Sequence, residues 1–292
     1  MKYSFITQHK NTFPVRLMCQ VLGVERSCYY HYRRQLDNRS PDPEHEEMLE
    51  WVRRIDDASD HTYGSRRMKR ALNCLGYPVS RNKARKLMQQ AEVQVRHRKK
   101  FKVTTNSNHQ HAVYDNLLQR QFDVAQSDRV YAADVTYIWT QEGWLYLAVV
   151  IDLCTRKVVG WSMSTRMKSQ LVCDALKMAI WQRRPKAGLI HHSDRGSQYA
   201  SKAFRKLLKI NRFEGSMSRQ GDCWDNAVVE SFFGSLKQER VQWRSYQTRY
   251  EAQQDILQYI SCWYNPYRLH STLNYVSPND YDKQLLEMKS AA

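Results

Sequence analysis

The spacing of hydrophobic residues changes near residue 130. Before that point apolar residues recur every three or four positions, as in helices, whereas after it they form short runs rich in β-branched and aromatic residues. The runs at 130–140, 144–151 and 157–164 have short polar separators, which predicts a three-stranded antiparallel meander. The following pattern predicts a helix whose inward side runs from Leu171 to Ala179, a strand at 188–192, a helix at about 201–210 and a strand at 213–217.

The helix predicted after the last strand separates apolar residues from polar ones. Its apolar stripe, spaced at intervals of three and four residues, consists of Val229, Phe232, Phe233 and Leu236. Asn226, Glu230 and Lys237 fall along the opposite side, because four or seven residues return close to the same direction around a helix. A carboxylate and an ammonium two turns apart, on a side that the core does not use, would suit a site for metal and phosphate.

The order of elements after residue 130, βββ-α-β-α-β-α, predicts an α/β domain with a ribonuclease-H-like fold. The first and fourth strands of this fold are neighbours, so Asp134 and Asp194 are expected to lie together, with Glu230 packed across the sheet. Three adjacent carboxylates disfavour one another's ionisation unless a cation is bound. Oxygen ligands without an organised set of histidines or cysteines indicate Mg²⁺ or Mn²⁺, and two such ions can serve an in-line phosphoryl transfer.

Residues 1–112 predict a separate helical region with helix-turn-helix-like units at about 12–35 and 63–91. For the first unit, broken at Gly23, a small packing module is an equally good interpretation. The second unit is clearer, because Gly76-Tyr77-Pro78 interrupts its helices and Ser80 is a natural N-cap. The stretch 103–116 lacks apolar periodicity and is interpreted as a linker. The catalytic core, with a C-terminal helical extension, is placed at 113–285.

Positive charge is concentrated in the helical region. The chain has a formal net charge of +17, and residues 61–112 hold thirteen lysines and arginines against one acid, Glu92. A charge run usually means a solvated face, but the near absence of acids favours contact with the phosphates of double-stranded DNA. The residues expected to make these contacts are Arg81, Lys83, Arg85, Lys86, Arg98, Lys99 and Lys100. The pattern predicts no base sequence.

Composition narrows the remaining classes of protein. The longest apolar run, 144–151, is too short to span a membrane, and the N-terminus does not resemble a signal peptide, so we expect a cytoplasmic protein. The seven cysteines include no Cys-x-x-Cys pair, which favours reduced thiols over disulfides or zinc ligands. Glycine patterns of nucleotide-binding loops are absent, which leaves nucleotide hydrolysis without support.

Several motifs resemble those of the DDE transposases of bacterial insertion sequences, in particular the two-frame type whose second frame (the OrfB product) encodes an integrase-like core. The motifs are Asp134-Val135-Thr136-Tyr137, residues 144–148, Ile151-Asp152, Gly160-Trp161, residues 192–199, 225–227 and 230–233, Tyr264-Asn265, Arg268, His270 and Ser277-Pro278. Asp194 and Glu230 are separated by 35 residues, the family's spacing, and Lys237 stands at its basic position. Tyr131 replaces the usual tryptophan but keeps an aromatic ring.

The resemblance implies metal-dependent cleavage and strand transfer of DNA, with Asp134, Asp194 and Glu230 as catalytic ligands of two Mg²⁺ or Mn²⁺ ions. A 3′-hydroxyl at the element end attacks another phosphodiester, by a copy-out and paste-in route through a joined-end circle. The implied partners are the terminal inverted repeats of an insertion sequence, target DNA, further copies of the chain, and an upstream helix-turn-helix and leucine-zipper protein, often a frameshift fusion. On DNA the protein would lie in the bacterial nucleoid.

Other polar residues near these motifs receive mainly structural interpretations. Asp152 is expected to shape the hairpin rather than bind metal, and Asp225 to cap the helix that follows it. Asn226 is either part of that cap turn or a contact supporting the neighbouring Glu230. His191 and His192 are expected to pack or to form hydrogen bonds.

Lys237, Arg195 and Arg268 are the candidate DNA contacts within the catalytic core. Two other functions fit parts of the sequence. A non-catalytic DNA-binding regulator would keep the basic region but should lose a carboxylate, and all three are present. A structure-selective nuclease of the same fold would cut DNA without joining it, and only the family motifs argue against that function.

Overall fold

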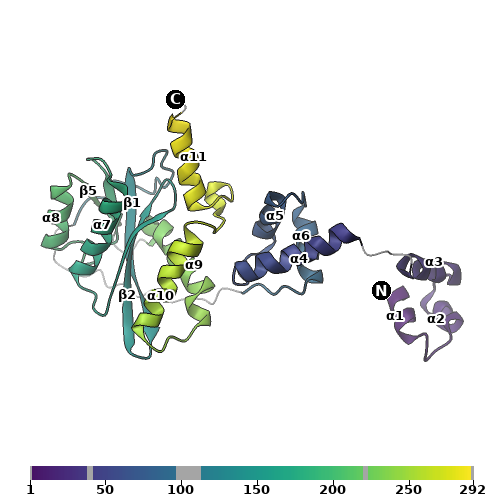
Figure 1. Ribbon diagram of the computed structural model, residues 1–292. Helices are drawn as coiled ribbons and strands as arrows, with labels where there is room; N and C mark the ends of the chain where they lie inside the picture. Colours follow the sequence, from purple (N-terminus) through teal and green to yellow (C-terminus); the bar gives the residue numbers. More distant parts are fainter. Residues whose placement is uncertain (1, 38–41, 97–112, 220–222, 291–292) are drawn as a thin grey trace.

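The computed structural model describes residues 2–37, 42–96, 113–219 and 223–290. Its N-terminal helices are α1 (Lys2–His9), α2 (Val15–Leu22), α3 (Arg26–Asp37), α4 (Pro43–Ala58), α5 (Ser65–Cys74) and α6 (Arg81–Gln90). The first three pack around one small apolar cluster that includes Ile6 and Tyr29, and the next three around another that includes Val52, Met68 and Leu72. Figure 1 shows them as two separate helical bundles.

The turns predicted within these bundles are present. Gly23 ends α2 with a φ of 60°, in the left-handed region that favours glycine. Ser80 caps α6, because its hydroxyl accepts a hydrogen bond from the N–H of Lys83 at 3.2 Å. Both predicted units therefore contain the expected pair of helices. Most of the linker predicted at 103–116 lies outside the described residues.

A five-stranded sheet forms the centre of the second half of the chain. Its strands are β1 (Val130–Thr140), β2 (Gly143–Asp152), β3 (Val158–Ser164), β4 (Ile190–Ser193) and β5 (Glu214–Met217), in the order β3-β2-β1-β4-β5. The first three form the predicted antiparallel meander, whereas β4 runs parallel to β1. The predicted adjacency of the first and fourth strands is confirmed, and with it the ribonuclease-H-like fold.

Helices cover both faces of the sheet (Figure 1). One face packs against α7 (Ser169–Arg183) and α8 (Lys202–Ile210), and the other against α9 (Ala227–Glu239) and α10 (Arg249–Gln258). Burial of these apolar faces stabilises the fold by roughly 25 cal/mol per Å² removed from water. Gly160 allows α7 to approach β3 closely, because a Cβ at this position would lie 2.2 Å from the carbonyl oxygen of Ala175.

The last part of the chain fastens the α4–α6 bundle to the sheet domain. The short elements here are η1 (Cys223–Asn226), η2 (Val241–Trp243), the π-helical η3 (Tyr259–Tyr264), η4 (Ser271–Leu273) and the terminal helix α11 (Pro278–Ser290). The carbonyl of Leu269 accepts a hydrogen bond from Arg67 at 3.1 Å, and its N–H donates to the Tyr63 hydroxyl at 2.8 Å. The ring of Tyr63 also lies 5.7 Å from that of Trp263.

A buried ion pair lies next to this junction. Arg268 bonds Glu239 at 2.6 Å, and both side chains are 5% exposed. Burial, the largest single influence, raises the pKa of Glu239, but the charge and hydrogen bonds of Arg268 together with the Tyr259 hydroxyl and the charge of Arg67 outweigh it, so the net pKa is lowered. The hydroxyl of Tyr259 donates a further hydrogen bond to Glu239 at 2.7 Å. The prediction that Arg268 contacts DNA is wrong for this structure, because its guanidinium is enclosed and satisfied within the protein.

Across the described residues, every helix is too short or too polar to cross a lipid bilayer. The cysteines whose side chains are described are free thiols, namely Cys19, Cys28, Cys74, Cys154, Cys173 and Cys262.

Removing Arg268 should destabilise the protein strongly. In Arg268→Ala the carboxylate of Glu239 loses its ion-pair partner while remaining buried, which costs about 3–5 kcal/mol of unfolding free energy. The deficit should shrink as the pH falls below about 4.3, because stabilisation by a carboxylate with a lowered pKa is complete above its ordinary value and is lost on protonation. Urea denaturation measures both effects. Arg54→Ala, which removes the exposed ion pair with Glu50, should cost at most about 1 kcal/mol. Equal losses in the two variants would contradict the argument.

Candidate active site

Two carboxylates meet where β1 and β4 separate. The parallel register pairs Val130 with Ile190 and ends with Ala133 opposite Ser193. Asp134 and Asp194 are the next residue on each strand, so both leave the paired region at the same level. Both side chains are half-buried. Beyond this point one edge of β1 no longer has a paired neighbour, which leaves room for side chains that approach from α9.

Helix α9 brings Glu230 and Lys237 to this edge. The predicted apolar stripe of the helix, which includes Val229 and Leu236, is buried against the sheet. Glu230 and Lys237 lie off that stripe, and both are close enough to Asp134 for their charges to act on it. The ammonium of Lys237 also lies 5.0 Å from the centre of the Tyr137 ring.

The electrostatics of the cluster favour a bound cation. Burial and the charge of Asp194 raise the pKa of Asp134 well above its usual range, while the N–H of Val135 opposes the shift. Partial burial also raises the pKa of Glu230. The pKa of Lys237 is lowered by burial, although Asp134 acts in the opposite direction. The carboxylates therefore disfavour one another's ionisation, and a bound divalent cation would favour their charged forms.

Asn226 ties the start of α9 to β1. Its side-chain amide donates a hydrogen bond to the carbonyl of Ala133 at 3.2 Å, immediately before Asp134. Asn226 directly precedes α9 but makes no capping bond with its side chain. Asn226 thus stands at the cap position of α9, while its side chain contacts the backbone next to the carboxylate cluster.

Asp225 was predicted to cap α9, and this prediction is wrong. It lies within η1, and its carboxylate instead accepts hydrogen bonds from Arg120 at 2.9 Å and from the side chain and backbone of Arg219. These hydrogen bonds, of which the one from the Arg219 side chain has the largest effect, hold the pKa of the Asp225 carboxyl well below its usual range. Asn116 donates another at 2.9 Å. The result is a clamp that joins the segment before β1 to the loop leading into α9.

The remaining predicted polar residues near the site have structural partners. The carboxylate of Asp152 accepts hydrogen bonds from the N–H and hydroxyl of Thr155, so it shapes the hairpin as expected. Burial lowers the pKa of His191 to about 3, and His192 bonds the hydroxyl of Ser216 at 2.9 Å. Both histidines are therefore neutral packing and hydrogen-bonding residues, as predicted.

The donor set fits a hard divalent metal. Asp134, Asp194 and Glu230 offer carboxylate oxygens, which suit Mg²⁺ or Mn²⁺. Two buried polar atoms nearby, the Tyr199 hydroxyl and Oδ1 of Asn226, have no hydrogen-bond partner among the described residues. Tyr199 lies within the influence of both aspartates, which raise its pKa after the larger effect of burial. These atoms add polar groups that water molecules around an ion could satisfy.

The three carboxylates are not drawn tightly together. Among the described residues, three possible metal-ligand atoms lie within 4.8 Å of one another in a group formed by Asp56, Asp57 and His61. In that group His61 already bonds Asp56 at 2.6 Å, so an ordinary hydrogen-bonded pair accounts for most of it.

Comparisons with known proteins give the family. An "Integrase core domain" model matches residues 124–223, a second model of that description matches 230–286, and an "HTH-like domain" model matches 43–101. The transposase InsF for insertion sequence IS3A of Escherichia coli (strain K12) is 38% identical over 289 residues, covering 98% of this chain and 100% of that protein. The chain belongs to the IS3 family of transposases.

A second insertion-sequence relative also covers nearly the whole chain, whereas a solved structure covers about half of it. A Shigella sonnei protein described as "Insertion element IS600 uncharacterized 31 kDa protein" is 40% identical over 272 residues, or 93% of this chain and 99% of that protein. Among solved structures, the catalytic core domain of BIV integrase aligns with a TM-score of 0.42 and 14% identity, covering 56% of this chain and 99% of that one. The InsF relatives and the matching family models show that the chain is an insertion-sequence transposase with an HTH-like region and an integrase core.

Apart from Lys237 and Arg268, described above, the predicted DNA contacts of the transposase fall into three groups. Arg81, Lys83, Arg85 and Lys86 are exposed on α6, whose buried side is Ala84, Leu87 and Met88. Arg195 lies beside the carboxylates and donates a hydrogen bond to the carbonyl of Ser218 at 2.7 Å. Arg98, Lys99 and Lys100 lie outside the described residues.

Sequence reasoning missed Arg120, Arg219 and Tyr199 as neighbours of the site. Arg120 is 105 residues from the aspartate it binds, and no local spacing indicates such a pair. Tyr199 is the last residue of the motif at 192–199, and its nearness to Asp194 in the sequence could have indicated that it lies at the site.

Breaking the tether between α9 and β1 should impair catalysis more than folding. Asn226→Ala removes the bond to Ala133, so Glu230 loses its fixed distance from Asp134, and DNA cleavage in Mg²⁺ should fall by about 10- to 100-fold. Asn211→Ala is the matched control, because Asn211 also donates from its amide to a backbone carbonyl, at the far end of α8. Cleavage rates and thermal unfolding are measured for both. If Asn226→Ala cleaves as fast as Asn211→Ala, the tether has no role in positioning.

Proposed function

We propose that the protein is a DDE transposase that cleaves DNA at the ends of an insertion sequence and transfers the resulting 3′-hydroxyl to target DNA. The observation that carries this proposal is the meeting of Asp134 and Asp194 where β1 and β4 diverge, with Glu230 acting on Asp134 from α9. Membership of the IS3 family supports the same chemistry.

Each residue of the site has a distinct task in this proposal. Asp134, Asp194 and Glu230 would hold two Mg²⁺ or Mn²⁺ ions, which would supply activation of the attacking oxygen and stabilisation of the leaving oxygen. Lys237 presents an ammonium at the rim, where it can bind a phosphate oxygen and orient the DNA strand. Asn226 keeps α9 at a fixed distance from β1.

The basic side of α6 is proposed to hold the DNA backbone. Arg81, Lys83, Arg85 and Lys86 are exposed along one helix and have no ion-pair partner among the described acids. Their contacts would be to phosphates, which position a duplex without reading its sequence. Arg195 is proposed to contact DNA next to the carboxylates.

The route of transposition is also a proposal. We propose a copy-out and paste-in route, with terminal inverted repeats and target DNA as substrates, at least two copies of the chain acting together, and an upstream-frame protein or fusion contributing end recognition. These features are those of the two-frame insertion sequences whose motifs the chain carries. Division of the chain into a DNA-binding region at 1–112 and a catalytic core at 113–285 belongs to the same proposal.

Replacing any carboxylate of the triad by its amide should abolish both cleavage and joining. Glu230→Gln keeps the size of the side chain but removes a charged metal ligand, so both rates should fall by about 1000-fold or more with DNA binding intact. Asp134→Asn and Asp194→Asn should behave alike. Paired DNA ends in Mg²⁺ are the substrate, and chelation by EDTA should reproduce the loss in wild type.

Glu214→Gln, which changes an exposed carboxylate on β5, is the control and should retain activity. An active Glu230→Gln would refute the triad assignment. A wild type that cuts DNA without ever joining strands would instead support a nuclease of the same fold.

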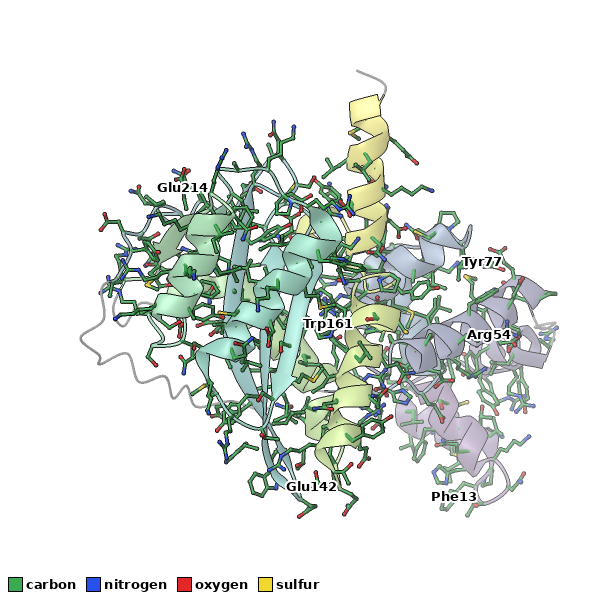
Figure 2. The ribbon with its side chains drawn as sticks, turned by 60° about the vertical axis from the view of Figure 1, so that its left-hand side comes forward. Phe13, Arg54, Tyr77, Glu142, Trp161 and Glu214 are labelled. Atoms are coloured by element: carbon green, nitrogen blue, oxygen red, sulfur yellow. The ribbon has the colours of Figure 1, made fainter. Side chains whose placement is uncertain are left out.

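Removing charge from α6 should weaken DNA binding uniformly across sequences. In Lys83→Gln, Arg85→Gln and Lys86→Gln, each lost phosphate contact should lower the salt dependence of log K by about 0.9. Fluorescence anisotropy with a labelled duplex at several salt concentrations measures this slope. The control changes Arg53 and Arg54, which are exposed on α4 (Figure 2 labels Arg54), to glutamine. A slope that falls equally in both sets would show that α6 has no special role.

A further inference from the structure

Three aromatic rings are exposed together on the β1–β2 hairpin. Tyr137, Trp139 and Trp144 are 40%, 55% and 44% exposed. Trp139 and Trp144 are direct partners in the antiparallel register, and their rings meet edge to face with centres 4.8 Å apart. Tyr137 meets Trp144 in the same way at 4.9 Å. We call these three residues the aromatic platform.

The hairpin that carries the platform is braced by hydrogen bonds although the three rings are exposed. Figure 2 shows Glu142, in the turn of the hairpin, at the end of the sheet farthest from α11. Arg249 braces this turn, because its backbone N–H donates to the carboxylate of Glu142 at 2.8 Å and its side chain donates to the carbonyl of Trp144 at 3.2 Å. Exposed rings with fixed positions lose little entropy on binding a flat ligand.

The platform begins at the rim of the carboxylate cluster. Tyr137 lies three residues after Asp134 on β1, and Lys237 joins the two regions. The Lys237 ammonium lies 5.0 Å from the centre of the Tyr137 ring, and the charge of Asp134 acts to raise the pKa of this ammonium. Side chains three residues apart on a strand point to opposite faces of the sheet, so it is Lys237 that brings the rings within reach of the site where phosphates are expected.

The chemistry of the platform matches a nucleobase attached to a phosphate. Aromatic faces bind bases by stacking, and a nearby ammonium binds the phosphate. The loop that follows β3 adds positive charge, because Ser164 pairs with Tyr146 on β2 and is followed by the exposed Arg166 and Lys168. A base paired within a duplex has its faces covered by its neighbours, so the matching ligand is an unpaired base.

We propose that Tyr137, Trp139 and Trp144 form a stacking site for an unpaired nucleobase of the DNA strand whose phosphate enters the carboxylate cluster. This proposal rests on the proposed function for the meaning of the site, but binding can be tested without catalysis. The platform would stabilise a locally opened DNA end and so place its backbone between Lys237 and the carboxylates.

The test compares single-stranded and blunt duplex DNA. Fluorescein-labelled oligo(dT) and a blunt duplex of equal length are titrated with the full chain, without divalent metal, and anisotropy gives the affinity. Trp139→Ala should weaken oligo(dT) binding by about 5- to 150-fold and leave duplex binding within twofold. Trp139→Phe should retain most of the affinity, because it keeps an aromatic face, whereas Trp139→Leu should not.

Trp181→Ala is the matched control, because Trp181 is 78% exposed on α7 and lies outside the platform. Wild-type affinity for oligo(dT) in Trp139→Ala would overturn the proposal, and so would equal loss of duplex binding. A change in oligomeric state with Trp139→Ala, measured by light scattering, would show instead that the platform joins two copies of the chain. If the binding result holds while the wild type neither cuts nor joins DNA, the proposed function fails and the stacking site stands.

Discussion

The parallel pairing of β1 with β4 is the constraint on which the site depends. Four residue pairs fix the register, and the pairing stops one residue before Asp134 and Asp194. A register shift by one residue would turn one aspartate to the opposite face of the sheet. The apolar residues of β1 and β2, buried beneath helices on both faces, prevent such a shift. Core packing therefore supplies the stability that holds two mutually repelling carboxylates in place.

Helix α9 joins this constraint to the rest of the molecule. Near its first turn Asn226 bonds the carbonyl of Ala133, and near its last turn Glu239 is locked to Arg268. The segment that carries Arg268 also holds Arg67 and Tyr63 of the α4–α6 bundle through Leu269. Helix α9 thus contacts the carboxylate cluster at one end, and at the other end it contacts the segment that is hydrogen-bonded to the α4–α6 bundle.

The sequence predicted the parts of this arrangement that arise from local pattern. The three strands of the meander, the helix with its stripe of Val229, Phe232 and Leu236, and the neighbouring first and fourth strands follow from periodicity and element order. The roles of Asp225 and Arg268 did not follow from local pattern, because the partners of each residue lie on other segments of the chain. Asp225 resembled a helix cap by its position alone, whereas Arg120 and Arg219 decide what its carboxylate binds.

The same distinction applies to the charge of the protein. A net charge of +17 indicates a polyanionic partner, but it does not show which cations can reach that partner. Arg183 is bound to Asp128 and Asp282, and Arg268 is buried against Glu239, so neither contributes to a DNA-binding surface. The four basic residues of α6 are exposed, and none is ion-paired among the described acids. Folding therefore uses Arg183 and Arg268 in internal ion pairs and leaves the four basic residues of α6 exposed, which fits the proposed division between duplex binding and strand chemistry.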